Sequence, residues 1–165
     1  MATPTTLPAS FTAATVLPAA SLNNLRGAFR ILQVVQGTTA TVTSNSTSTY
    51  ADTTLTATIT PQSSSSKILV LVSHGSVFKT GSSTSGVMLR LVRGSTTIAN
   101  FGAGIGYTGS VLDITSSCST VYLDSPAVAT ATTYKTQFAN NANAASVQVQ
   151  VSSSISTITL LEVSA

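Results

Sequence analysis

Charged residues are scarce in this sequence. Asp, Glu, Lys and Arg make up 7% of the 165 residues, whereas about 25% is usual for a globular domain. Serine and threonine account for 55 of the 165 residues, so hydroxyl groups must supply most of the polar surface. The net charge of +3 comes from seven scattered basic residues and four acidic ones. Because no basic cluster or stacking platform of interleaved aromatic and basic residues is present, the sequence predicts no nucleic-acid binding.

Cysteine and histidine are almost absent. A single cysteine, Cys118, excludes an intrachain disulfide framework and a cysteine-based zinc site. A Ser-His-Asp arrangement would need His74, the one histidine, which is expected at the end of the buried strand beside Gly75, and no Gly-x-Ser-x-Gly elbow accompanies it. A carboxylate pair of the glycosidase type would have to come from four acidic residues far apart along the chain: Asp52, Asp113, Asp124 and Glu162. We therefore expect no enzyme activity, no metal site and no cofactor.

Long hydrophobic runs are absent as well. Mean hydropathy is +0.38, yet no window approaches the roughly 18 consecutive apolar residues of a membrane-spanning helix. We therefore expect no membrane insertion. The N-terminus lacks the charged start and continuous apolar core of a secretory signal, because proline and threonine interrupt each apolar run. These features fit a protein that is made in a cytoplasm and later placed outside a cell.

Alternation of apolar and polar residues is the main positive signal. Between residues 53 and 60, Leu55, Ala57 and Ile59 alternate with threonines, which is typical of a half-buried strand. Similar short runs, separated by turns rich in Gly, Ser, Asn and Pro, give roughly ten strands and no long helix. We predict an all-β fold over residues 29–165, an antiparallel β-sandwich of the jelly-roll kind.

The most apolar stretch, residues 67–101, is expected to supply the central strands. The five-residue apolar run that begins at Ile68 is predicted to be buried on both faces of its sheet. Gly94 should close a hairpin, because tight turns require a positive φ. Residues 104–109 match the Gly-x-Gly-x-x-Gly dinucleotide fingerprint, but residues 111–115 follow with a strand pattern where a helix is required. The glycine-rich segment is therefore predicted to be a loop at one end of the sandwich.

Residues 1–28 are predicted to form an extended N-terminal docking arm. Three prolines, Pro4, Pro8 and Pro18, disfavour both a helix and a sheet interior. Apolar residues between and after them are the expected anchors of the arm on a partner: Phe11, Val16, Leu17, Leu22 and Leu25.

Several segments carry a resemblance to a known class of proteins. A Phe-Thr-x-x-x-x-Leu-x-Ala segment and a Leu-Asn pair precede the first expected strand in FTAATVLPAASLNNLRGAFRILQVVQ. They are followed in order by DTTLTATITPQSSSSKILVLVS, LVRGSTTI, VYLDSPAVATATTYKTQF and STITLLEVSA. Together these segments resemble bacteriophage tail-fibre and other virion structural proteins that have a C-terminal β-sandwich domain. The repetitive shaft of long fibres is not present in the sequence.

The resemblance implies a virion structural protein that is assembled in the host cytoplasm. As a tail-fibre or tail-tip component, it would dock onto other virion proteins through residues 1–28 and present its head to a host-surface glycan or protein. Tyr50 and Tyr107 are the expected exposed loop contacts. The alternative is a capsid decoration protein that stabilises the phage head without touching the host, which the missing shaft favours.

Self-association is expected from the distribution of apolar residues. The segments 67–73 and 155–163 carry apolar residues on both faces, so one face can pack inside the sandwich and part of the other against a neighbour. Closed symmetry uses such a surface without open-ended aggregation. The resemblance supplies the number of subunits and implies a homotrimer.

Overall fold

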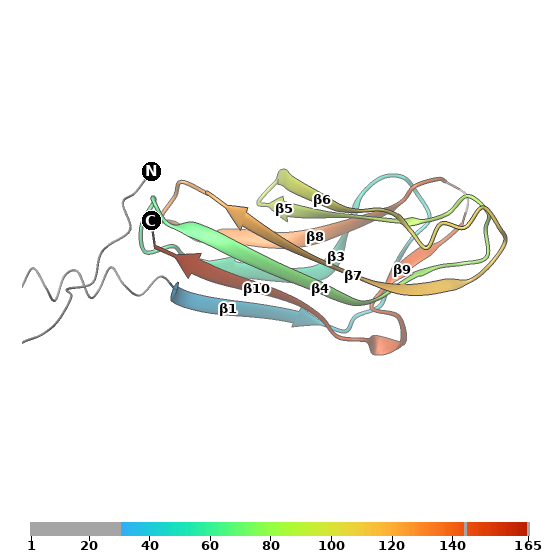
Figure 1. Ribbon diagram of the computed structural model, residues 1–165, viewed down its shortest axis with the longest axis horizontal. Helices are drawn as coiled ribbons and strands as arrows, with labels where there is room; N and C mark the ends of the chain where they lie inside the picture. The colour runs from blue at the N-terminus through green and yellow to red at the C-terminus, as the bar shows by residue number, and fades with distance from the viewer. Residues whose placement is uncertain (1–30, 144, 165) are drawn as a thin grey trace, which may run out of the picture.

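The structure, a computed structural model, describes residues 31–143 and 145–164. Two antiparallel sheets pack face to face in an elongated sandwich (Figure 1). The predicted all-β sandwich is confirmed, and within the described ranges the only helical element is the single 3-10 turn η1 (Val151–Ser153). In the same part of the chain, no helix is long and apolar enough to cross a membrane. The predicted arm lies outside the described residues.

Eight long strands form the two layers. The first sheet contains, in spatial order, β1 (Ile31–Thr39), β10 (Ser156–Val163), β4 (Lys67–Lys79) and β7 (Ile114–Asp124). The second contains β3 (Ala51–Ile59), β8 (Thr132–Asn140), β5 (Val87–Arg93) and β6 (Thr96–Ile105). Two short strands, β9 (Val147–Val149) and β2 (Thr43–Asn45), extend the first sheet beside the far end of β4. The order β1-β10-β4-β7 facing β3-β8-β5-β6 is that of an eight-stranded jelly roll.

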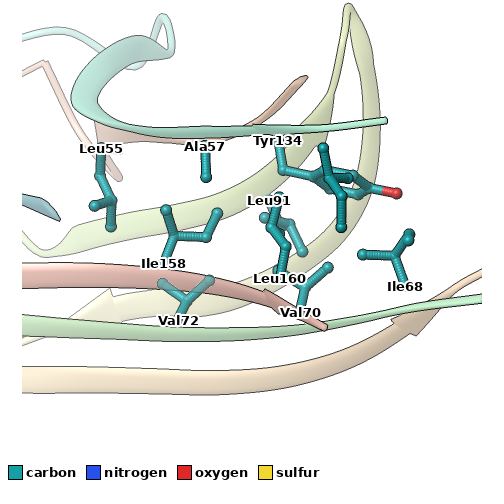
Figure 2. Close-up of a cluster of buried hydrophobic side chains, with 10 residues drawn as sticks. Leu55, Ala57, Ile68, Val70, Val72, Leu91, Tyr134, Ile158 and Leu160 are labelled. Atoms are coloured by element: carbon teal, nitrogen blue, oxygen red, sulfur yellow. The ribbon is translucent and has the colours of Figure 1, made fainter. Parts of the chain in front are cut away.

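The main core forms between β3 of one sheet and β4 and β10 of the other. Leu55 and Ala57 of β3 are buried, and Thr56 between them is exposed, as the period of two requires. Figure 2 shows these side chains pointing toward Val72 and Ile158 from the opposite sheet. Each fully buried aliphatic side chain of this kind contributes about 1.5 to 3 kcal/mol of transfer free energy. The hydrophobic effect therefore holds the two sheets together.

The prediction that the central apolar run is buried on both faces is wrong. In β4, Ile68, Val70 and Val72 point into the sandwich and are at most 3% exposed, whereas Leu71 points outward and is 37% exposed. A sandwich has only two layers, so a strand of either sheet has one face toward the core. The outer face of β4 therefore carries leucines that no other described segment of the chain buries completely.

The strand predicted over residues 111–115 begins later and runs further than expected. One strand, β7, begins at Ile114 and pairs with β4 as far as Asp124. The serines around Ser116 lie within this strand, where the register with β4 shifts between His74 and Val77. The predicted hairpin at Gly94, by contrast, is confirmed, with φ of +59° at this glycine between β5 and β6.

An ion pair links the sheets at the end where β1 begins. Arg93 of β5 donates two hydrogen bonds to Asp124 of β7, at 2.9 and 2.7 Å from Nη1 to the two carboxylate oxygens. The hydroxyl of Tyr134 on β8 donates to the same carboxylate at 2.6 Å. The tyrosine is fully buried, and both burial and the adjacent carboxylate raise its pKa. The cluster therefore joins β7 of the first sheet to β5 and β8 of the second.

Candidate functional site

The residues predicted to anchor the arm lie outside the described residues: Phe11, Val16, Leu17, Leu22 and Leu25. The structure does place the point at which that segment joins the sandwich. Ile31 at the start of β1 pairs with Val163 at the end of β10, which pairs in turn with Lys67 at the start of β4. Ile31, the first described residue, therefore lies at the end of the sandwich where β1 and β4 begin and β10 ends (Figure 1).

An exposed loop lies at the opposite end of the sandwich. Residues 106–113, here called the loop tip, connect β6 to β7 next to Lys79, the last residue of β4. The 13 residues of β4, at about 3.3 Å each, separate its two ends by roughly 40 Å. Tyr107 is 57% exposed, Val111 72% and Leu112 55%. Tyr107 is thus exposed in a loop as predicted, together with two aliphatic residues that had been predicted to lie in a strand.

A buried lysine braces the loop tip. Lys79 has no exposed surface, and its ammonium group donates to Thr108 Oγ1 at 3.0 Å and to the Ser110 carbonyl at 3.2 Å. It also donates to the carbonyl of Ser82 in the neighbouring loop between β4 and β5. All three acceptors are uncharged oxygen atoms, so the lysine acts as a crosslink between two loops. The sequence around Lys79, at the end of an apolar strand, contains no pattern that predicts this contact.

Glycines shape the loop tip, and they do so without forming a nucleotide site. Gly106 and Gly109 have φ of +77° and +66°, values that L-residues with a side chain rarely adopt. The Tyr107 amide donates to the Gly104 carbonyl at 3.0 Å, which closes a tight turn. A strand follows at Ile114 in place of the helix that a dinucleotide fingerprint requires. The predicted loop at the end of the sandwich is confirmed.

Tyr50, the second predicted loop contact, is less available than Tyr107. It is half-buried, and the Arg90 guanidinium lies 3.9 Å from the centroid of its ring. Arg90 is held in turn by Gln137, whose amide oxygen accepts from Nε at 2.9 Å and from Nη2 at 2.6 Å. A cation over an aromatic face contributes about 0.5 to 1 kcal/mol at an exposed site. The Tyr50 ring therefore offers one face at most to a partner.

Charged groups gather around this ring on the outer face of the second sheet. Asp52 accepts from Lys135 Nζ at 2.8 Å and from Gln137 Nε2 at 2.7 Å. Partial burial raises the pKa of Asp52, but these two hydrogen bonds outweigh it and lower the pKa below its ordinary value. A small hollow of about 150 Å³ lies beside the pair and is lined by Thr54 and Thr56. This face is polar, with Asp52 and Lys135 as an ion pair and Arg90 against Tyr50 and Gln137.

A polar cluster surrounds His74 inside the sandwich. His74 lies in the middle of β4, not at a strand end as predicted, and it is completely buried. Its Nε2 lies 3.1 Å from Thr136 Oγ1 of the opposite sheet. In the orientation that satisfies all partners, the Gln150 side-chain oxygen accepts from His74 Nδ1 at 3.1 Å and from Ser156 Oγ at 3.0 Å. Burial lowers the pKa of the imidazole to about 4.

The His74 cluster has little capacity for chemistry. Its hydrogen-bonding partners are neutral amides and hydroxyls, so no carboxylate orients the imidazole as a catalytic triad would require. Every group named in the cluster is buried. Among residues 31–143 and 145–164, no group of three or more His, Cys, Asp and Glu side chains could hold a metal ion. The cluster joins the sheets, and the surfaces left for recognition are the loop tip and the outer faces of the sandwich.

Comparison with known proteins adds no family to this description. No protein-family model matches the sequence, and no curated protein matches it significantly.

Proposed function

We propose that this protein is a structural component of a bacteriophage virion, located in a tail fibre or at the tail tip. It docks onto other virion proteins through its N-terminal residues and presents a trimeric jelly-roll head for attachment to a host-surface glycan or protein. The resemblance of its segments to virion β-domains supports the class of protein. The charge-poor, hydroxyl-rich composition is compatible with it.

The observation that carries the proposal is the distance between the two ends of the sandwich. Residues 1–30 join it at one end, and the loop tip with exposed Tyr107, Val111 and Leu112 lies roughly 40 Å away at the other. A protein that docks at one end and binds at the other needs this separation. Lys79 crosslinks the loops behind the tip and so limits the conformational entropy lost when the tip binds.

A capsid decoration protein is the second candidate. A jelly-roll head that follows an N-terminal segment would fit a clamp between capsomers as well as a fibre end. The two candidates differ in what the loop tip does, since a decoration protein needs no exposed contact with the host.

Deleting residues 1–28 is expected to leave the head folded and to abolish its incorporation into virions. Among the described residues, the buried clusters lie within residues 55–160 and already join the two sheets. The truncated and full chains, expressed during infection, would be compared by thermal melting and by their amounts in purified particles. Gold labelling of particles that contain the full chain then separates tail from capsid. Equal incorporation of the two chains, or a truncated chain that does not melt cooperatively, would contradict the proposed role of the arm.

A further inference from the structure

The outer faces of the two sheets differ in charge. Asp52, Arg90 and Lys135 lie on the outer face of the β3-β8-β5-β6 sheet. The outer face of β1, β10, β4 and β7, here called the apolar face, carries among its described residues one charged side chain, Lys67, at its margin. A sheet face that remained in water would be expected to carry polar side chains outward, whereas Leu71, Val121 and Leu123 are exposed here.

Apolar side chains form one complete row across the apolar face and half of a second row. The strand register aligns two rows perpendicular to the strands, the first with Val34, Leu161, Leu69 and Leu123 and the second with Gln36, Thr159, Leu71 and Val121. Several of these side chains are well exposed, with Val121 at 64%, Val34 at 58% and Leu123 at 51%. Contiguous exposed apolar surface of this kind marks an interaction site on most proteins.

The apolar face has a hollow next to its projecting side chains. An open depression of about 320 Å³ is lined mainly by outward-facing residues of β4, β7 and β10: Leu71, Ser73, Ser119, Val121, Thr157 and Thr159. Val121 and Leu123 stand at its side on β7. A face that has both projections and a hollow can fit against a second copy of itself or of its flank, which symmetric assemblies require.

The size of the apolar face suits a contact between proteins. At about 4.8 Å between strands and about 3.3 Å per residue, the paired strands cover a plane of about 600 Å². A standard interface buries about 800 Å² on each partner, and side chains standing out of the plane add to the planar figure. The face is therefore large enough for a stable interface and is far larger than a subsite for a small ligand.

We propose that the apolar face is the surface through which copies of this chain associate, with Leu71 and Val121 at its centre. A second copy is the occupant, because the one charged side chain among the described residues of the face, Lys67, lies at its margin, and the chain has too few charged residues to keep such a surface in water. The inference names the surface of the proposed assembly and rests on the proposed function only for the number of three subunits. If the chain's own N-terminal segment covered the apolar face instead, the proposal would be wrong.

Val121→Lys is expected to weaken self-association of the full chain by about 100-fold or more, because a lysine at the centre of a dry interface must lose its hydration without a partner. Sedimentation velocity across a micromolar concentration series would measure it. The matched control is Thr58→Lys, which places the same side chain at an exposed strand position on the opposite sheet. The control is expected to associate like the natural chain. Equal association of both variants would overturn the proposal.

A second measurement covers the case in which Val121→Lys does not fold. Val121→Cys and Thr58→Cys, each combined with Cys118→Ser, report accessibility through their rates of alkylation by a maleimide. In the assembled chain, the cysteine at 121 is expected to react at least about tenfold more slowly than the one at 58, since reaction needs the interface to open. Equal rates, or protection at 121 in a chain that sediments as a monomer, would overturn the proposal, and the second result would assign the face to the N-terminal segment.

Incorporation into virions separates this inference from the proposed function. A chain that enters particles but does not associate through the apolar face would contradict the inference alone. A chain that associates through the apolar face but is absent from virions would contradict the proposed function alone.

Discussion

Replacing Asp124 with alanine is expected to lower the free energy of unfolding by about 2 to 3 kcal/mol, because the buried Tyr134 hydroxyl loses its acceptor and Arg93, whose side chain is 27% exposed, loses its partner. Asp124 accepts two hydrogen bonds from Arg93 and one from the buried Tyr134 hydroxyl. Without the carboxylate, both donors stay in place with no acceptor, and the end of the sandwich where β1 begins loses its link between the sheets. Urea denaturation at pH 7 would measure the difference.

Asp52→Ala is the matched control for Asp124→Ala. Asp52 also accepts from one basic side chain, Lys135, and from one neutral side chain, Gln137. Its side chain is 52% exposed, whereas that of Asp124 is 8% exposed. An exposed ion pair contributes at most about 1 kcal/mol, so the control should lose no more than that. Similar losses for the two variants would show that the Asp124 cluster does not hold the sheets together.

Lowering the pH from 7 to 4 is expected to cost about 3 kcal/mol of the free energy of unfolding through His74. Burial lowers its pKa in the folded protein to about 4, while the unfolded chain titrates near 6.5. Between these values the unfolded chain binds a proton that the folded protein does not, so protonation favours unfolding. Stability should therefore be complete above about pH 6.5 and fall by about 1.4 kcal/mol per pH unit down to pH 4.

The loss of stability between pH 7 and pH 5 can be assigned to His74, because it is the one histidine of the chain and ordinary carboxylates titrate largely below about pH 5. In His74→Gln, an uncharged amide takes the place of the imidazole among Thr136, Gln150 and Ser156. This variant should show almost no change in stability between pH 7 and pH 5, as measured by urea denaturation in a series of buffers. A natural chain that is equally stable at pH 7 and pH 5 would contradict the burial of a neutral imidazole.

The fold class could be predicted from the alternation of apolar and polar residues, because most strands here have one face toward solvent. The alternation of Leu55, Ala57 and Ile59 with threonine fixed both the strand and the side that it buries. Gly94 marked its turn for an equally local reason, since φ is positive there.

Features that depend on contacts between distant parts of the chain could not be predicted from the local alternation of residues. A continuous apolar run is typical of a strand buried on both sides and also of a strand whose second face meets another copy, and β4 has one exposed row in the isolated chain. His74 was predicted at a strand end because Gly75 follows it, whereas the strand continues to Lys79. The brace from Lys79 to the loop tip joins residues about 30 positions apart, and no sequence period records such a contact.

The mass of the full chain in solution tests the assembly at the centre of this account most directly. Light scattering at micromolar concentration should give about 50 kDa, three times the 16.7 kDa of one chain, because closed symmetry buries the apolar face in every subunit. A dimer would keep the apolar face as the interface and correct the number of subunits. A stable monomer of 16.7 kDa across the concentration series would contradict the account.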